Sequence, residues 1–575
     1  MRLRISKSKN VTLYYVIKTI YVKGKQKTKT IERLGNEQEV IEKSNGEDPI
    51  IWAKKYIEEL NKKEKENTND IIIKKSQTKQ IEKDSQNLYN CGYLFLEKIY
   101  YDLKLDKICE DISDDHQFKY DLNNILSNLI FGRIIFPSSK LATNELSKTF
   151  IEQPNFKLHD IYRALEVIAK KNDFIQSELY KNSLKIIDRN SKILYYDCTN
   201  YFFEIEEEKG IRKYGASKEH RPNPIVQMGL FMDGNGIPLA FNINAGNTNE
   251  QITMTPLEKK IIKDFDVSKF VVCTDAGLAS NANRLFNNKK DRAFITTQSI
   301  KKLKKYQKEW ALESTGWQLT GSDKTYDISK IEDTEENKKL YKDKTFYKER
   351  WLNENGLEQK FIVTYSLKYK YYQEKIRNSQ IERAKNAIEN NSSKLDKCNQ
   401  NDYKRFIKKT SVTKDGEIAE EKILAIDETI ISKESQYDGF YGVCTNLDDT
   451  VEDIIKVNHM RWEIEESFRI MKTEFKSRPV YLSNDDRIQA HFMTCYISLL
   501  IHRILEKKLG EKYTTSEIVN CLRKMNMIKI ETEGYIPAYT RTDLTDSLHD
   551  IFGFRTDFEI TSEKKMKKIL KDIKK

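Results

Sequence analysis

Residues 192–205, KILYYDCTNYFFEI, decide the fold, because this apolar and aromatic stretch is interrupted near its middle by an acid, Asp197. Apolar residues that point to both faces are typical of a strand buried inside a sheet. A second short apolar run, KFVVCTDAG at residues 269–277, also ends in an acid, Asp275. The sequence therefore predicts two buried strands that each carry one aspartate.

The segments around these two strands predict a regular order of elements. Residues 225–246 predict a β-hairpin with Asp233-Gly234-Asn235-Gly236 as its turn. Helices are expected at residues 255–263 and 280–288, and a further strand at 292–299. The resulting order is strand, hairpin, helix, strand, helix, strand, and it matches an RNase H-like core. We therefore expect an α/β fold whose first strand carries one Asp and whose fourth strand ends at another.

The rest of the chain predicts several further domains around this core, as expected for 575 residues. A mixed insertion divides the core into two parts, and small α+β and helical domains precede it. The expected boundaries are 1–85 for a small mixed domain and linker, 86–190 for a helical DNA-binding domain, 191–300 for the first part of the core, 301–435 for the insertion, 436–510 for the second part of the core, and 511–575 for a basic C-terminal region.

Composition favours a polyanionic partner and excludes some classes of protein. The formal net charge is +12, and a protein gains affinity for DNA by displacing counterions from phosphates. Codon bias toward Lys and Asn is an alternative explanation for this charge. The eight cysteines form no CxxC pair, so no zinc site or disulfide framework is implied. The longest apolar stretch near the C-terminus, residues 495–501, is too short to cross a bilayer, and we interpret the protein as soluble and intracellular, without a membrane partner.

The two aspartates suit phosphodiester chemistry, which uses hard cations held by oxygen ligands on rigid elements. Asp197 lies in the middle of one predicted strand and Asp275 at the end of another. A carboxylate among apolar neighbours is costly unless a cation compensates it. Most single acids lie at the surface or in turns, so a third carboxylate is needed to support the interpretation.

Helical geometry in residues 451–475 identifies Glu465 as the candidate for the third carboxylate. At about 100° per residue, Arg461, Glu465 and Lys472 fall on one narrow arc that borders a buried apolar stripe. Glu463 and Glu466 point away from this arc. The alternative is a surface Arg–Glu pair at i,i+4, which would contribute a few tenths of a kcal/mol.

These residues resemble a known family, the bacterial insertion-sequence DDE transposases with the Tyr-Arg-Glu-Lys signature, spaced Y-x2-R-x3-E-x6-K. Arg461, Glu465 and Lys472 match this spacing, whereas Asn458 stands at the Tyr position. The flanking segments also resemble the family, in this order along the chain: FPSSKLA, YYDCTNYFFE, HRPNPIVQMGL, IPLAFNINAGNTNE, TDAGLAS, YDGFYGVCTN and RPVYLSNDDRIQAHF.

The resemblance implies a mechanism and a set of partners. Asp197, Asp275 and Glu465 would form the catalytic, metal-binding triad for two Mg²⁺ or Mn²⁺ ions, and no other cofactor is implied. Water would free 3′-hydroxyls at the transposon ends, which would then attack target DNA. Arg461 and Lys472 would hold the DNA backbone. The expected partners are terminal inverted repeats, target DNA and a second copy of the chain in a synaptic homodimer, in a bacterial cytoplasm and on the nucleoid when bound to DNA.

Two other functions remain open from the sequence. One is an RNase H-like DNA nuclease that cuts without strand transfer. The other is a catalytically inactive DNA-binding protein derived from a transposase, which the departure at Asn458 keeps possible.

Overall fold

The computed structural model describes the chain except residues 9–10, 23–24, 45, 68–72, 74, 117, 332–333, 391–401 and 413–420. Part of the predicted linker after residue 60 therefore lies outside the described residues. The chain divides into two compact units. Unit 1 contains residues 1–87, 529–536 and 558–564, and unit 2 contains the remainder. No helix in the described part of the chain is long and apolar enough to cross a membrane.

Unit 1 is built on an antiparallel three-stranded sheet with the order β1-β2-β3. Two helices follow the sheet, and Val16, Leu34, Val40, Ala53 and Ile57 form the centre of its core. Unit 1 also contains an antiparallel pairing of β18 with β19. The elements are β1 (Arg2–Lys7), β2 (Thr12–Val22), β3 (Lys25–Asn36), α1 (Glu37–Lys43), α2 (Pro49–Asn67), β18 (Gly534–Pro537) and β19 (Thr561–Ser562).

Unit 2 contains a mixed sheet of ten strands, in the order β11-β10-β12-β13-β16-β9-β8-β5-β6-β7. β5 pairs antiparallel with β6 and parallel with β8, and β9 is parallel to β8. The strands are β5 (Ile193–Phe202), β6 (Ile225–Asp233), β7 (Pro238–Ala245), β8 (Phe270–Thr274), β9 (Arg292–Gln298), β10 (Trp317–Leu319), β11 (Ser322–Tyr326), β12 (Phe346–Glu354), β13 (Leu357–Tyr365) and β16 (Phe440–Thr445).

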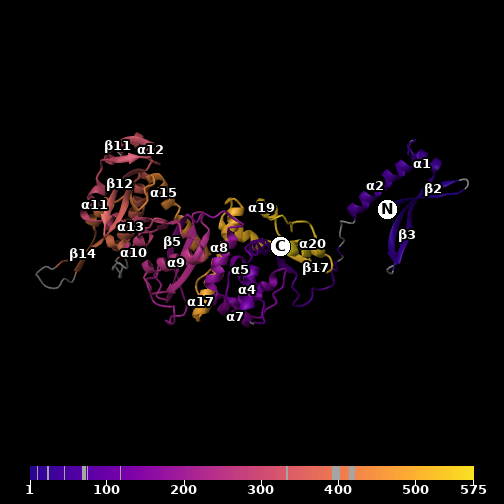
Figure 1. The fold of residues 1–575 in the computed structure, drawn as a ribbon, viewed down its shortest axis with the longest axis horizontal. Helices are drawn as coiled ribbons and strands as arrows, with labels where there is room; N and C mark the ends of the chain where they lie inside the picture. Colours follow the sequence, from indigo (N-terminus) through magenta and orange to yellow (C-terminus); the bar gives the residue numbers. More distant parts are fainter. Residues whose placement is uncertain are drawn as a thin grey trace. The chain divides into compact units, whose positions relative to one another are not determined.

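The strands from the predicted insertion extend the same sheet. β12 and β13 pair antiparallel, and β16 pairs with β13 on one side and β9 on the other. In Figure 1 these strands lie at the end of unit 2 away from α4, α5 and α7. The other elements of this region are α11 (Lys305–Leu312), α12 (Glu335–Tyr341), α13 (Leu367–Glu389), β14 (Ile407–Val412), β15 (Glu421–Ile426) and α14 (Glu428–Ser435).

Helix α17 (Asp485–Lys508) is buried along most of its length, and it joins the sheet to the helices that precede it in the chain. It contacts β7 and α16, and also α3, α5 and α7. The preceding helices are α3 (Tyr93–Asp102), α4 (Leu105–Asp115), α5 (Leu122–Ile135), α6 (Lys140–Leu146), α7 (Leu158–Lys170) and α8 (Asn172–Ser183). The remaining elements are β4 (Leu88–Asn90), α9 (Met254–Asp264), α10 (Asn281–Asn287), α15 (Val451–His459), α16 (Trp462–Thr473), α18 (Thr515–Lys524), β17 (Asn526–Ile530), α19 (Asp543–Phe552) and α20 (Glu563–Ile573).

The predicted hairpin and its turn are confirmed by the pairing of β6 with β7. The expectation of one continuous helix over residues 451–475 is wrong. The chain forms α15 and α16, with Met460 and Arg461 in a turn between them. Ile464 N–H donates to Arg461 O at 3.2 Å across this turn, so the register of α16 begins at Arg461.

Candidate active site

Asp197 lies in β5, and Asp275 directly follows β8, the neighbouring parallel strand. Tyr195 of β5 is paired with Cys273 of β8, so the residues two positions further on, Asp197 and Asp275, lie at the same level. Burial raises the pKa of Asp197 to about 6, and the negative charge of Asp275 contributes to the increase. Asp275 Oδ1 accepts the backbone N–H groups of Gly277 and Leu278 at 3.0 and 3.1 Å, which fix its orientation. The charge of Asp197 is thus incompletely compensated in the folded protein.

Lys218 is the cation with the largest effect on Asp197. It lowers the pKa of that carboxyl more than Arg461 does, although burial outweighs both. Its ammonium donates to the Cys198 carbonyl and lies 3.5 Å from Glu250 Oε1. Burial alone would lower the pKa of Lys218, but Asp197 and Glu250 raise it overall. The ammonium is therefore held charged beside the two aspartates.

Arg461 links all three predicted carboxylates. Its Nη1 lies 3.3 Å from Glu465 Oε1. Burial lowers the pKa of Arg461, whereas Tyr441, Glu465, Asp197 and Asp275 raise it overall. The side chain of Glu465 is 59% exposed. The donor oxygens of Asp197, Asp275 and Glu465 do not all lie within 4.8 Å of one another, and the guanidinium pairs with Glu465 while the two aspartates act on it electrostatically.

The other two glutamates of α16 already have arginine partners. Glu463 is buried 3.5 Å from Arg503 of α17, and Glu466 lies 2.6 Å from Arg469. Both point away from the arc of Glu465, as predicted, but the face with Glu463 is buried as well. The reason is that α16 packs between β5 and α17. Glu465 is therefore the glutamate of this helix that shares a cation with the aspartates.

Lys472 lies on the inner side of α16, beside the same group of charges. Its Nζ is 3.5 Å from Glu219 Oε1 and 5.4 Å from the centre of the Tyr201 ring. Burial, with a smaller contribution from Lys218, lowers the pKa of Lys472 to about 8, and Asp197 opposes the decrease. A nearby anion would favour the charged form of this lysine and raise its pKa again.

Asn458, which stands at the signature Tyr position, is buried and bonded to a different tyrosine. Its Nδ2 donates to the Tyr441 hydroxyl at 3.0 Å, and that hydroxyl lies 2.7 Å from Thr297 Oγ1. Tyr441 comes from β16, and it has the largest effect among the groups that raise the pKa of Arg461 and so oppose the effect of burial. A phenol is thus present beside Arg461 although position 458 lacks one.

Sequence reasoning missed Lys218, Glu219, Tyr441 and Arg478. Arg478 forms an ion pair with Glu219 and lies over the Phe202 ring at 5.9 Å. The segment KEHRPNP at 218–224 is rich in cations and precedes β6, which was the available signal. Its place beside Asp197 depends on long-range folding that no local pattern shows.

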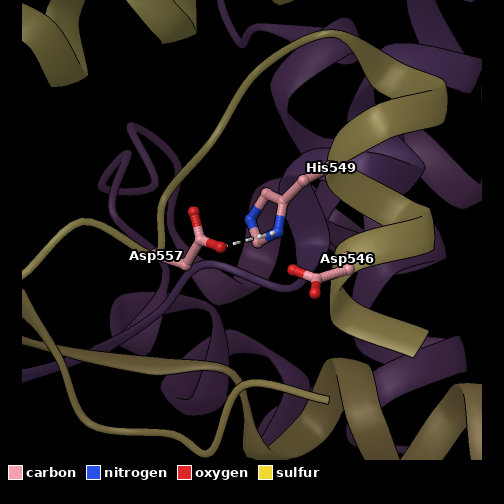
Figure 2. Close-up of side chains that lie close together, drawn as sticks. All are labelled: Asp546, His549 and Asp557. Carbon is pink, nitrogen blue, oxygen red and sulfur yellow. Dashed lines mark ion pairs between the residues drawn. The ribbon is translucent and has the colours of Figure 1, made fainter. Parts of the chain in front are cut away.

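A second cluster, Asp546, His549 and Asp557, has two carboxylates and an imidazole within the distance range of a metal site (Figure 2). However, Arg555 Nη2 lies 2.8 Å from Asp546 and 2.7 Å from Asp557. Hydrogen bonding from Arg555 lowers the pKa of Asp557 to about 2. The arginine already supplies the positive charge that a metal would bring, so we interpret this cluster as a structural ion-pair network.

Comparison with protein-family models supports an enzyme of this kind. Residues 201–501, over half of the chain, match the family model described as the transposase DDE domain. The match contains Asp275 and Glu465 and begins four residues after Asp197. A chain in the cryo-EM structure of the piggyBac transposase synaptic complex with hairpin DNA is similar at 7% identity and a TM-score of 0.35, with 84% of each chain covered. No match was found among curated proteins.

The family also bears on the cofactor. Transposases with this domain are generally dependent on divalent metal ions. The chain belongs to the transposases that carry a DDE domain, and it is an enzyme of the DDE transposase type.

Proposed function

We propose that this chain cleaves DNA at transposon ends and transfers the freed strands into target DNA, with Asp197, Asp275 and Glu465 as its catalytic triad. The observation that carries the proposal is the convergence of these carboxylates on Arg461. Asp197 and Asp275 share one level of the sheet, and Glu465 lies 3.3 Å from the same guanidinium. Carboxylates on two strands and one helix give the rigid convergence that phosphodiester chemistry requires.

The strand order supports an RNase H-like core in this proposal. An antiparallel meander, β5-β6-β7, continues through β8 and β9 parallel to β5. The spacing of Arg461, Glu465 and Lys472 supports membership of the bacterial insertion-sequence group with the Tyr-Arg-Glu-Lys signature. The helical region 86–190 is proposed to bind DNA, and residues 301–435 are proposed as an insertion that extends the sheet.

The donor set fits two Mg²⁺ or Mn²⁺ ions, because all three candidate ligands supply carboxylate oxygens. Asp197 has a pKa raised to about 6 in the presence of Lys218 and Arg461, so its charge is under-compensated and favours a further cation. When bound, such ions activate the attacking hydroxyl and stabilise the leaving oxygen. The residues that would hold them are Asp197, Asp275 and Glu465.

The neighbouring cations are proposed to hold the scissile phosphate. The Arg461 guanidinium can grip two phosphate oxygens, and the Lys472 ammonium acts as a point charge. Lys218 belongs to the same group because it lies over Asp197 and keeps its proton. The proposed partners are terminal inverted repeats and target DNA, joined by a homodimer of the chain in a bacterial cytoplasm.

The test is cleavage of DNA that spans both edges of the gene's own locus, in Mg²⁺, Mn²⁺ or EDTA. We expect metal-dependent nicks at discrete ends followed by strand-transfer products. Glu465→Gln should abolish both, whereas the control Glu466→Gln removes a glutamate that is paired with Arg469 and should leave them. Nicks without transfer products would identify a nuclease, DNA binding without nicks would identify an inactive derivative, and equal cutting by Glu465→Gln would exclude this glutamate.

A further inference from the structure

A cavity of about 470 Å³ lies between the end of α5, the start of α6 and the segment after α16. Arg133, Lys140, Lys476, Arg478 and His491 are among its lining residues. Among the described residues that line it there is no Asp or Glu. The volume lies within the range of small-ligand sites, and the lining is strongly cationic.

Lys140 is the most unusual residue of this cavity. It is only 5% exposed, and the described residues that line the cavity around it include no acid. Burial, with a smaller contribution from Arg133, lowers its pKa to about 7. A buried ammonium without an anionic neighbour is costly to the fold, and a buried cation that lines a cavity is a candidate ligand-binding group.

Arg133 adds a second buried positive charge, and no acid in the described part of the chain forms an ion pair with it. It is 5% exposed, and its guanidinium donates to the carbonyl groups of Phe475, Lys476 and Ser138 at 3.0, 3.3 and 3.1 Å. Its Nε has no partner. These neutral acceptors fix the orientation of the guanidinium and leave its charge available to the cavity.

The cavity is connected to the carboxylate site through a short chain of contacts. Arg478 lines the cavity and pairs with Glu219, which also lies 3.5 Å from Lys472. Val480, another lining residue, donates its backbone N–H to Phe202 O at 3.2 Å, at the end of the strand that carries Asp197. A polyanion that reaches the carboxylates therefore passes near the cavity.

We propose that this cavity binds a backbone phosphate of the DNA strand that enters the active site, with Lys140 as its principal ligand. The inference rests on the proposed function for the identity of the strand. Lys140 and Arg133 supply the charge, and the Arg478 guanidinium contributes from the side that faces the carboxylates. The buried charge of Lys140 lowers the stability of the free protein, and a bound phosphate neutralises this charge and stabilises the protein.

The test combines DNA affinity with stability, using Lys140→Met, which keeps the length of the side chain and removes its charge. Binding of duplex DNA from the edges of the locus is measured by fluorescence anisotropy from 50 to 200 mM salt. Loss of one phosphate contact should reduce the salt slope by about 0.9, so that the wild type loses about 3.5-fold more affinity than the variant over this range. The melting temperature of the free variant should equal or exceed that of the wild type.

The matched control is Lys385→Met, which removes an exposed lysine of α13 that does not line the cavity and should keep the wild-type slope. An unchanged slope with a lower melting temperature in Lys140→Met would identify a structural lysine and overturn the proposal. If inorganic phosphate stabilises the wild type but not Lys140→Met, while the DNA slopes are equal, the site takes a free anion and the DNA assignment is wrong. Wild-type protein that does not bind DNA at all would instead refute the proposed function.

Discussion

The charge state of Asp197 gives the sharpest prediction, because a catalytic ligand is expected to cost stability before its metal arrives. Its pKa is raised from 3.8 to about 6, mainly by burial. The folded state therefore holds this proton to higher pH than the unfolded chain, and stability falls as pH rises from about 4 to about 6. The full difference corresponds to about 3 kcal/mol at pH 7.5, an upper limit for a side chain that is partly exposed.

We expect Asp197→Asn to be more stable than the wild type at pH 7.5 in EDTA, by up to about 3 kcal/mol, and to lose this advantage near pH 4. Urea unfolding at both pH values measures the difference. Mn²⁺ should stabilise the wild type and leave the variant unchanged. A variant that is less stable than the wild type at pH 7.5 would refute the reasoning, because the carboxylate would then be well compensated by Lys218, Arg461 and the Cys198 N–H group.

Three further predictions concern the surroundings of the site. Arg461→Lys should lower the single-turnover cleavage rate by at least about tenfold without loss of folding, because a point charge replaces a bidentate group; rate measurements and circular dichroism test both parts. Asn458→Tyr should lower the urea midpoint by the equivalent of about 1–3 kcal/mol, because position 458 is buried and the Tyr441 hydroxyl lies 3.0 Å from Asn458 Nδ2. An unchanged midpoint would contradict the inference that this position has no room for a larger side chain. Arg189→Met should lower the free energy of unfolding in urea by about 3–5 kcal/mol, because Asp233 stays buried without the cation that now lies 2.6 Å away. The double variant that also carries Asp233→Asn should recover part of this free energy.

Local patterns were enough to predict the centre of the sheet, and the reason is physical. The strands around Asp197 and Asp275 are buried on both faces, so their sequences are continuously apolar up to the acid. The hairpin between them has a Gly-rich turn in which Gly236 adopts a φ of +76°, a conformation that favours glycine. Both features depend only on residues that are close together in the sequence.

Features that depend on distant partners were not predictable in this way. The burial of Glu463 follows from Arg503, forty residues along the chain, and not from the periodicity of α16. The placement of β13 beside β16 brings the predicted insertion into the sheet through pairing across about eighty residues. Lys218 reaches Asp197 because the segment before β6 returns over the strand that carries the acid. Such contacts are set by tertiary packing, which local propensity does not encode.

The pKa of Asp197 is raised and that of Lys472 is lowered, and these opposite shifts indicate which bound charges would stabilise the site. Burial raises the pKa of the acid to about 6 and lowers that of the lysine to about 8, so each charged form is disfavoured although the two groups interact. If the carboxylates and cations served only to neutralise one another, both charged forms would be stabilised. A metal ion would favour the charged acid and a phosphate would favour the charged lysine, and a metal-bound phosphodiester brings both at once. A bound metal ion and phosphate would relieve the strain at Asp197 and Lys472, whereas Lys218 and Arg461 are already stabilised as cations by neighbouring acids.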